Sequence, residues 1–286
     1  MIYVLASAIC SVLVSVLLKL ARRFALDVGQ MVAWNYAMAC ALAALLLQPA
    51  LAPLRAAVAP WFALVGLGVL LPVIFLALGA SVRHAGIVRS DVAQRLSLLL
   101  SLLAAFLLFG EKLDATKALG CALGLLALLG MVWRAEPGRG EGGPASWRWP
   151  LLVFAGFGAI DVLFKRVAAA GVPLGTSLLA MFVLALPVAF ALAVSQRLRG
   201  GMRFTLPSVI GGLLLGLLNF GNIFFYLRAH RALPHDPALV FASMNLGVVV
   251  LGALAGVAVF REKLSRINLA ALGLALLAIV LLTRGG

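Results

Sequence analysis

The sequence contains two similar short stretches at half-chain spacing, Phe-Gly-Glu-Lys-Leu at residues 109–113 and Phe-Arg-Glu-Lys-Leu at residues 260–264. Four of the five residues agree, and each stretch follows one long apolar run and precedes another. Other polar residues recur at corresponding places, namely His84 with His235, Gln94 with Asn245 and, at a slightly shorter offset, Lys19 with Lys165. This pattern predicts a chain made of two related halves.

The composition excludes an ordinary soluble domain. Of the 286 residues, 64% are hydrophobic and 11% are charged, whereas soluble domains have about 45–50% apolar and about 25% charged residues. Unbroken apolar runs such as 96–109 and 246–260 are too long for the alternating strands of a membrane barrel. Because only helices satisfy their own backbone groups in lipid, we expect an all-α polytopic membrane protein.

Glycine, proline and charged residues divide the chain into ten predicted transmembrane helices. The spans are 2–21, 29–48, 61–81, 86–109, 115–133, 149–170, 174–196, 206–228, 237–260 and 267–282. We expect the first span to be retained, because Arg22 and Arg23 follow it and no basic residue precedes it. A Gly-rich polar linker at 135–148 separates a first five-helix repeat, 1–134, from a second, 149–286.

The odd number of helices in each half has a consequence for topology. Equivalent helices would cross the membrane in opposite directions, which gives an inverted repeat. Transporters with such repeats bind their substrate near the membrane midplane and work by alternating access.

The duplicated element, an apolar helix, Phe-x-Glu-Lys-Leu and then a Gly-bearing helix, resembles the EamA type of the drug/metabolite transporter superfamily. The resemblance covers essentially the whole chain. It implies a ten-helix fold with a central cavity, in a protein that transports small metabolites, often amino acids. It does not identify the substrate.

Polar residues inside apolar spans are costly in lipid and are therefore candidate site residues. The predicted substrate-binding set is Lys19, Asn35, Asp91, Gln94, Arg95, Asp161, Lys165, Asn219, Asn222, Tyr226 and Asn245. Asp161 and Lys165 lie four residues apart on one helical face. They form either a structural ion pair, or a proton-carrying carboxylate beside a cation that holds a substrate carboxylate. The pair Asp91 and Arg95 has the same spacing and the same two interpretations.

The amides also have two interpretations. Asn219, Asn222 and Tyr226 share one helical stripe, which Arg228 and His230 are not expected to share well. Such a stripe either makes hydrogen bonds between helices or lines a cavity, and the same applies to Asn35, Gln94 and Asn245.

The pairs Gly120 and Gly124, Gly212 and Gly216, and Gly252 and Gly256 are expected to let helices approach closely. Capping and ion pairing beside Lys112 and Lys263 are expected for Glu111 and Glu262.

The charge balance bears on orientation. There are 23 Lys and Arg against nine Asp and Glu, giving +14, and we interpret these cations as interfacial rather than as a nucleic-acid surface. With this segmentation eight cations share the side of the termini and 23 minus eight, or fifteen, lie opposite. The positive-inside rule then places both termini outside, whereas the resemblance favours the cytoplasm. The three cysteines lack metal-ligand spacing.

Together these features predict a secondary transporter in a bacterial inner membrane that moves an amino acid or organic anion without ATP. We expect no enzymatic activity, metal or cofactor. The expected partners are the substrate, membrane lipid and a coupled proton or counter-substrate, in a monomer or homodimer. One alternative is cation efflux, although the first helix lacks an acidic residue. A second is a lipid-modifying enzyme, although the sequence has no nucleophile elbow or paired histidines. A third is a passive subunit of another membrane protein.

Overall fold

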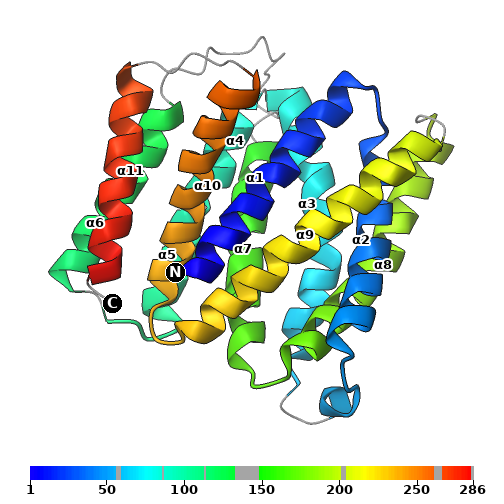
Figure 1. Cartoon of the computed structure of the whole chain (residues 1–286), viewed down its shortest axis with the longest axis horizontal. Coiled ribbons are helices and arrows are strands. Elements are labelled where there is room, and N and C mark those ends of the chain that lie inside the picture. Colours follow the sequence, from blue (N-terminus) through cyan, green and yellow to red (C-terminus); the bar gives the residue numbers. More distant parts are fainter. Residues whose placement is uncertain are drawn as a thin grey trace. The chain divides into compact units, whose positions relative to one another are not determined.

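The computed structural model describes residues 1–55, 59–85, 87–112, 114–132, 148–200, 204–260 and 266–284, and every regular element in this part is helical (Figure 1). The first-half elements are α1 (Ile2–Arg23), α2 (Val28–Leu47), the 3-10 turn η1 (Ala52–Arg55), α3 (Trp61–Ala85), α4 (Ile87–Leu96), α5 (Leu98–Leu107) and α6 (Ala115–Val132). The second-half elements are α7 (Arg148–Ala169), α8 (Leu174–Leu198), α9 (Leu206–Ala232), α10 (Pro237–Phe260) and α11 (Arg266–Arg284). The predicted linker lies outside the described residues except for Arg148, which begins α7.

One predicted span differs in the structure. The span expected over 86–109 is interrupted at Ser97, between α4 and α5. The Ser97 hydroxyl donates a hydrogen bond to the Gln94 carbonyl oxygen at 2.6 Å. A serine hydroxyl that bonds a carbonyl of the preceding turn competes with the backbone ladder and bends the helix.

Five of the described helices are long and apolar enough to cross a bilayer. These segments are Val28–Leu47, Trp61–Ser81, Leu174–Leu198, Leu206–Ala232 and Pro237–Val259. Shorter apolar helices cover Ile2–Leu18, Ala93–Leu107, Ala115–Leu129 and Leu269–Thr283. Large apolar side chains are exposed on them, for example Phe62 at 87%, and surfaces of this kind are stable only against lipid or a partner. The chain has the character of an integral membrane protein.

The chain forms two compact units. Unit 1 contains Met1–Ala8, Ala77–Val162 and Ala232–Gly286, and unit 2 contains Ile9–Leu76 and Leu163–Arg231. Each unit therefore combines helices from both halves of the sequence.

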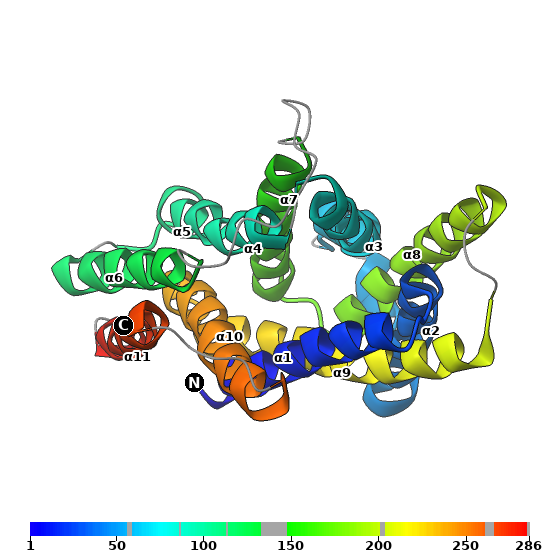
Figure 2. The same ribbon diagram turned by 90° about the horizontal axis from the view of Figure 1, so that it is seen from above.

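In unit 1, α6 packs side by side with α11 (Figures 1 and 2). A Cβ atom built on Gly120 would lie 2.8 Å from Leu282 Cγ, and one on Gly124 would lie 3.8 Å from Ala278 Cβ. The residue numbers rise along α6 as they fall along α11, so the two helices are antiparallel. They are the fifth helices of the two halves.

In unit 2, α2 packs against α8 in the same manner. A Cβ atom on Gly29 would lie 2.5 Å from Gln196 Oε1, and one on Gly175 would lie 2.8 Å from Leu47 Cβ. These contacts join the start of each helix to the end of the other. The second helices of the two halves are therefore antiparallel as well.

The predicted glycine faces are confirmed on α6 and α9 but not at Gly252. Cβ atoms on Gly212 and Gly216 would lie 2.7 Å from the Met31 carbonyl oxygen and 2.6 Å from that of Asn35. Because these neighbours are backbone atoms of α2, the glycines allow α9 and α2 to touch. A Cβ atom on Gly252 would meet nothing within 4 Å, so this position is not a close packing point.

Candidate functional site

The predicted site residues divide between the two units. Unit 2 holds Lys19, Asn35, Lys165, Asn219, Asn222 and Tyr226, and unit 1 holds Asp91, Gln94, Arg95, Asp161 and Asn245. The side chains of Lys19 and Asp91 lie outside the described residues.

Asn35 and Asn219 lie at the contact between α2 and α9. Gly216 meets the backbone of Asn35, and Asn219 follows Gly216 by three residues on the same helical stripe. The two helices run in parallel here, because Gly212 meets Met31 while Gly216 meets Asn35 and Met38. Asn219 therefore faces α2 about three residues, roughly 4.5 Å along the helix axis, beyond Asn35.

These amides are buried without hydrogen-bond partners. In the described part of the chain, Asn35 Oδ1 and Nδ2, Asn219 Nδ2 and the Tyr36 hydroxyl make no hydrogen bond. The exposed fractions are 0% for Asn35 and Tyr36 and 6% for Asn219. An unpaired buried polar group costs about 1–3 kcal/mol. These four polar atoms therefore make no interhelical hydrogen bond in the described part of the chain.

We call Asn35, Tyr36 and Asn219 the amide cluster. Aromatic rings lie next to it. The centroid of Phe182 on α8 lies 6.5 Å from that of Tyr36 and 6.2 Å from that of Phe220 on α9. Tyr36 and Phe182 were not predicted from the sequence, in which the phenol beside Asn35 in an apolar span was the available signal for Tyr36.

A second polar group in unit 2 joins α7 to α9. The ring of Phe164 packs edge-on against Tyr226 at 5.7 Å, and Tyr226 packs against His230 at 4.7 Å. Lys165, which follows Phe164 on α7, is buried. His230 therefore shares the Tyr226 stripe, contrary to the sequence-based expectation, because 226 and 230 are four residues apart.

In unit 1, Asp161 is held by a residue that the sequence analysis did not select. Its Oδ2 atom accepts a hydrogen bond from Ser101 Oγ of α5 at 2.6 Å, and Ser101 is fully buried. Gln94 and Arg95 are half-buried on α4. Asn245 Nδ2 donates to the Phe241 carbonyl oxygen of its own helix at 2.9 Å, so this amide differs from those of the amide cluster.

The first copy of the repeated motif builds an ionic network in unit 1. Glu111 Oε1 accepts a hydrogen bond from Lys117 Nζ at 3.1 Å, and its Oε2 accepts one from the backbone N–H of Ala238 at 2.7 Å. Lys117 Nζ also donates to Asp236 Oδ1 at 2.6 Å. Glu111 therefore caps the start of α10, where the helix dipole favours an anion. Lys112, the partner expected from the sequence, is exposed, and Glu262 with Lys263 lies outside the described residues.

Burial and pairing shift the pKa of the Glu111 carboxyl group in opposite directions. Burial raises the pKa of its carboxyl group, and the Ala238 N–H and the Lys117 ammonium partly offset that rise. This network joins the loop before α6 to the turn before α10. Among the described residues, no three His, Cys, Asp or Glu side chains are grouped for metal binding.

Comparisons with known proteins agree with this architecture. Residues 1–133 match the model of the EamA-like transporter family. An uncharacterized protein of Haemophilus influenzae is 40% identical over 267 residues, covering 91% of this chain and 90% of its own length. A crystal structure with 20% sequence identity superposes with a TM-score of 0.74 over 98% of this chain and 96% of the other, which supports the fold. The chain belongs to the EamA-like transporter family.

Proposed function

We propose that this protein is a secondary transporter that moves a small polar metabolite, an amino acid or an organic anion, by alternating access between two inverted five-helix repeats. The observation that carries the substrate class is the amide cluster, whose buried amide and phenol groups have no partner among the described residues.

The helix pairs support the inverted repeat. The second helices of the halves, α2 and α8, are antiparallel, and so are the fifth helices, α6 and α11. Two copies with the same membrane polarity would run these equivalent helices in parallel. Inverted repeats are the usual basis of alternating access in secondary transporters.

The cluster favours a solute with both donors and acceptors. A hydrocarbon ligand would leave the amides of Asn35 and Asn219 unpaired at a cost of about 1–3 kcal/mol each. A zwitterion or hydroxylated acid would satisfy them. The buried cation Lys165 in the same unit adds attraction for a carboxylate.

A ligand screen tests the substrate class. Detergent-solubilised protein is heated with amino acids, organic anions or lipophilic cations, and its unfolding temperature is recorded. A ligand present at about 100 times its dissociation constant stabilises the folded state by about 2.7 kcal/mol. We expect an amino acid or organic anion to raise the unfolding temperature, and the shift to disappear in Asn219→Leu. Stabilisation by lipophilic cations alone would refute the substrate class.

A further inference from the structure

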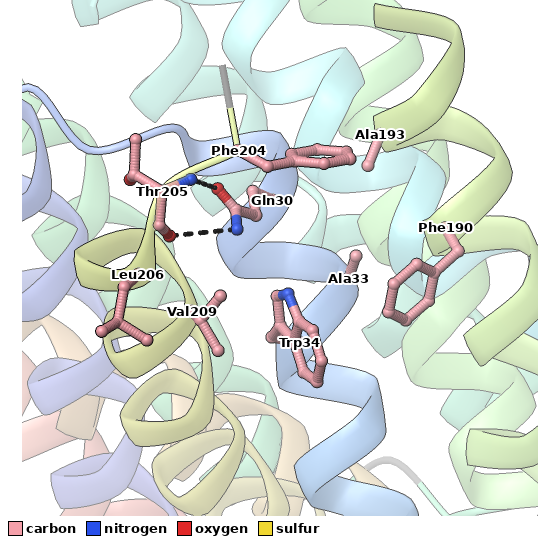
Figure 3. Close-up of a pocket in the computed structure, with 9 residues that line it drawn as sticks. All are labelled: Gln30, Ala33, Trp34, Phe190, Ala193, Phe204, Thr205, Leu206 and Val209. Carbon is pink, nitrogen blue, oxygen red and sulfur yellow. Dashed lines mark hydrogen bonds between the residues drawn. The ribbon is translucent and has the colours of Figure 1, made fainter. Parts of the chain in front are cut away.

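A separate cavity of about 360 Å³ lies in unit 2, between the start of α2, the end of α8 and the start of α9 (Figure 3). Gln30 and Trp34 line it from α2, Phe190 from α8, and Phe204 and Leu206 from the start of α9. None of the eleven predicted substrate-binding residues is part of its lining. The cavity is therefore distinct from the amide cluster.

The polar groups of the cavity are largely used within the protein. Gln30 Nε2 donates to the Thr205 carbonyl oxygen at 3.1 Å, and Thr205 N–H donates to Gln30 Oε1 at 2.9 Å (Figure 3). The indole N–H of Trp34 has no partner among the described residues, and the remaining lining is mostly hydrocarbon. A polar metabolite would lose its hydration here without replacement hydrogen bonds, whereas a hydrocarbon chain would fit.

The rim of the cavity belongs to the apolar surface of the protein. Phe204 is 50% exposed and Leu206 is 70% exposed, and Ile210 one turn further along α9 is also exposed. Surfaces of this kind in a membrane protein face acyl chains. An acyl chain could therefore enter the cavity laterally from the bilayer.

Positive charge lies at the same end of these helices. Arg197 follows Phe190 and Ala193 on one stripe of α8, at spacings of seven and four residues, so it extends beyond the cavity wall. Arg197 and Arg199 are exposed, and neither guanidinium has a partner among the described side chains. Asp27 lies near this end, but its Oδ1 accepts the Gln30 backbone N–H at 2.7 Å as a helix cap.

The flanking sequence has the same charge bias. Residues 20–30 and 195–205 together contain five Arg and one Asp. Positively charged helix ends face the leaflet that carries anionic lipid, and basic residues beside membrane helices bind anionic headgroups. The Trp34 nitrogen edge faces the Gln30 end of the cavity (Figure 3), as is common for indoles at the boundary between acyl chains and headgroups.

We propose that this cavity binds one acyl chain of an anionic phospholipid whose phosphate is held by Arg197 and Arg199. The Trp34 N–H donates to the ester carbonyl of the same lipid. The bound lipid contacts α2, α8 and α9 together and stabilises their packing at this end of unit 2. It is a resident lipid and not the transported solute.

Quenching of Trp34 fluorescence tests the site. A variant retains Trp34 and carries Phe at Trp61, Trp133, Trp147 and Trp149, so that Trp34 alone reports. It is reconstituted in phosphatidylcholine vesicles that contain increasing fractions of phosphatidylglycerol with brominated chains, or of brominated phosphatidylcholine. We expect half-maximal quenching at a lower fraction of the anionic lipid, by about fivefold for each contributing arginine.

Matched variants separate the chain from the headgroup. Arg197→Gln with Arg199→Gln should remove the preference for the anionic lipid, whereas Arg55→Gln, in η1 beyond the opposite end of α2, should preserve it. Ala193→Phe should reduce quenching by both lipids, and Val209→Phe fills the cavity from α9 if the first variant does not fold. Equal quenching by both lipids in the parent, or a preference that survives both arginine substitutions, would overturn the proposal. Preferential quenching by a brominated fatty acid over phosphatidylglycerol would overturn it too.

Discussion

Replacing Asn35 by Leu should stabilise this protein and abolish its transport. Both side-chain polar atoms of Asn35 are buried and unpaired among the described residues, and leucine has a similar shape without polar atoms. Removing the unpaired amide should raise the free energy of unfolding by about 1–3 kcal/mol. A change of 1 kcal/mol corresponds to a shift of about 2–4 °C for a domain of roughly this size. We therefore expect an increase of about 2–12 °C in the unfolding temperature.

The matched control is Gln30→Leu, an amide on the same helix with the opposite environment. Gln30 is buried and makes two hydrogen bonds with the backbone of Thr205. Losing them should lower the free energy of unfolding by about 1–3 kcal/mol. Thermal unfolding in detergent, followed by intrinsic fluorescence, compares the two variants with the parent protein. If Asn35→Leu is destabilised as much as Gln30→Leu, the amide serves packing and the reasoning from unpaired groups is wrong.

Lys117→Met should lower the free energy of unfolding by about 3–5 kcal/mol, because it leaves the buried Glu111 carboxylate without its cation. Burial raises the pKa of Glu111, so this loss of stability should grow as pH rises through that pKa and the carboxyl group becomes charged. Adding Glu111→Gln should remove this pH dependence of thermal unfolding. Gly216→Ala should destabilise because its Cβ would lie 2.5 Å from Met38 Cβ, whereas Gly79→Ala, with nothing within 4 Å, should stabilise by up to about 1 kcal/mol in the same unfolding assay. Asp161→Asn and Lys165→Ala should each abolish flux in vesicles while leaving folded protein, and normal flux in both would make the pair structural.

Much of the fold could be predicted from the sequence because lipid imposes a simple rule on the backbone. Apolar runs ended by Gly, Pro or charge predicted most helices to within a few residues. The interruption at Ser97 was not predicted, because a serine hydroxyl that bonds the Gln94 carbonyl oxygen is a local contact that hydropathy does not contain.

The site was harder to predict because it depends on contacts between distant segments. Asn35 and Asn219 could be selected as polar residues in apolar spans, but their unpaired state depends on Gly216 bringing α9 onto α2. The partners of Glu111 were not its neighbour in sequence but Lys117, Asp236 and the N–H of Ala238. Ser101 was not considered because a single serine in an apolar helix is common.

Flux through the purified protein tests the proposed transport most directly. Protein reconstituted in ATP-free liposomes is supplied with labelled amino acids, organic anions and lipophilic cations, and uptake is compared with protein-free liposomes and with Asn35→Leu. We predict saturable uptake of an amino acid or organic anion that the parent shows and the variant lacks. Uptake equal to that of protein-free liposomes for every polar solute, or equal uptake by parent and variant, would contradict the account.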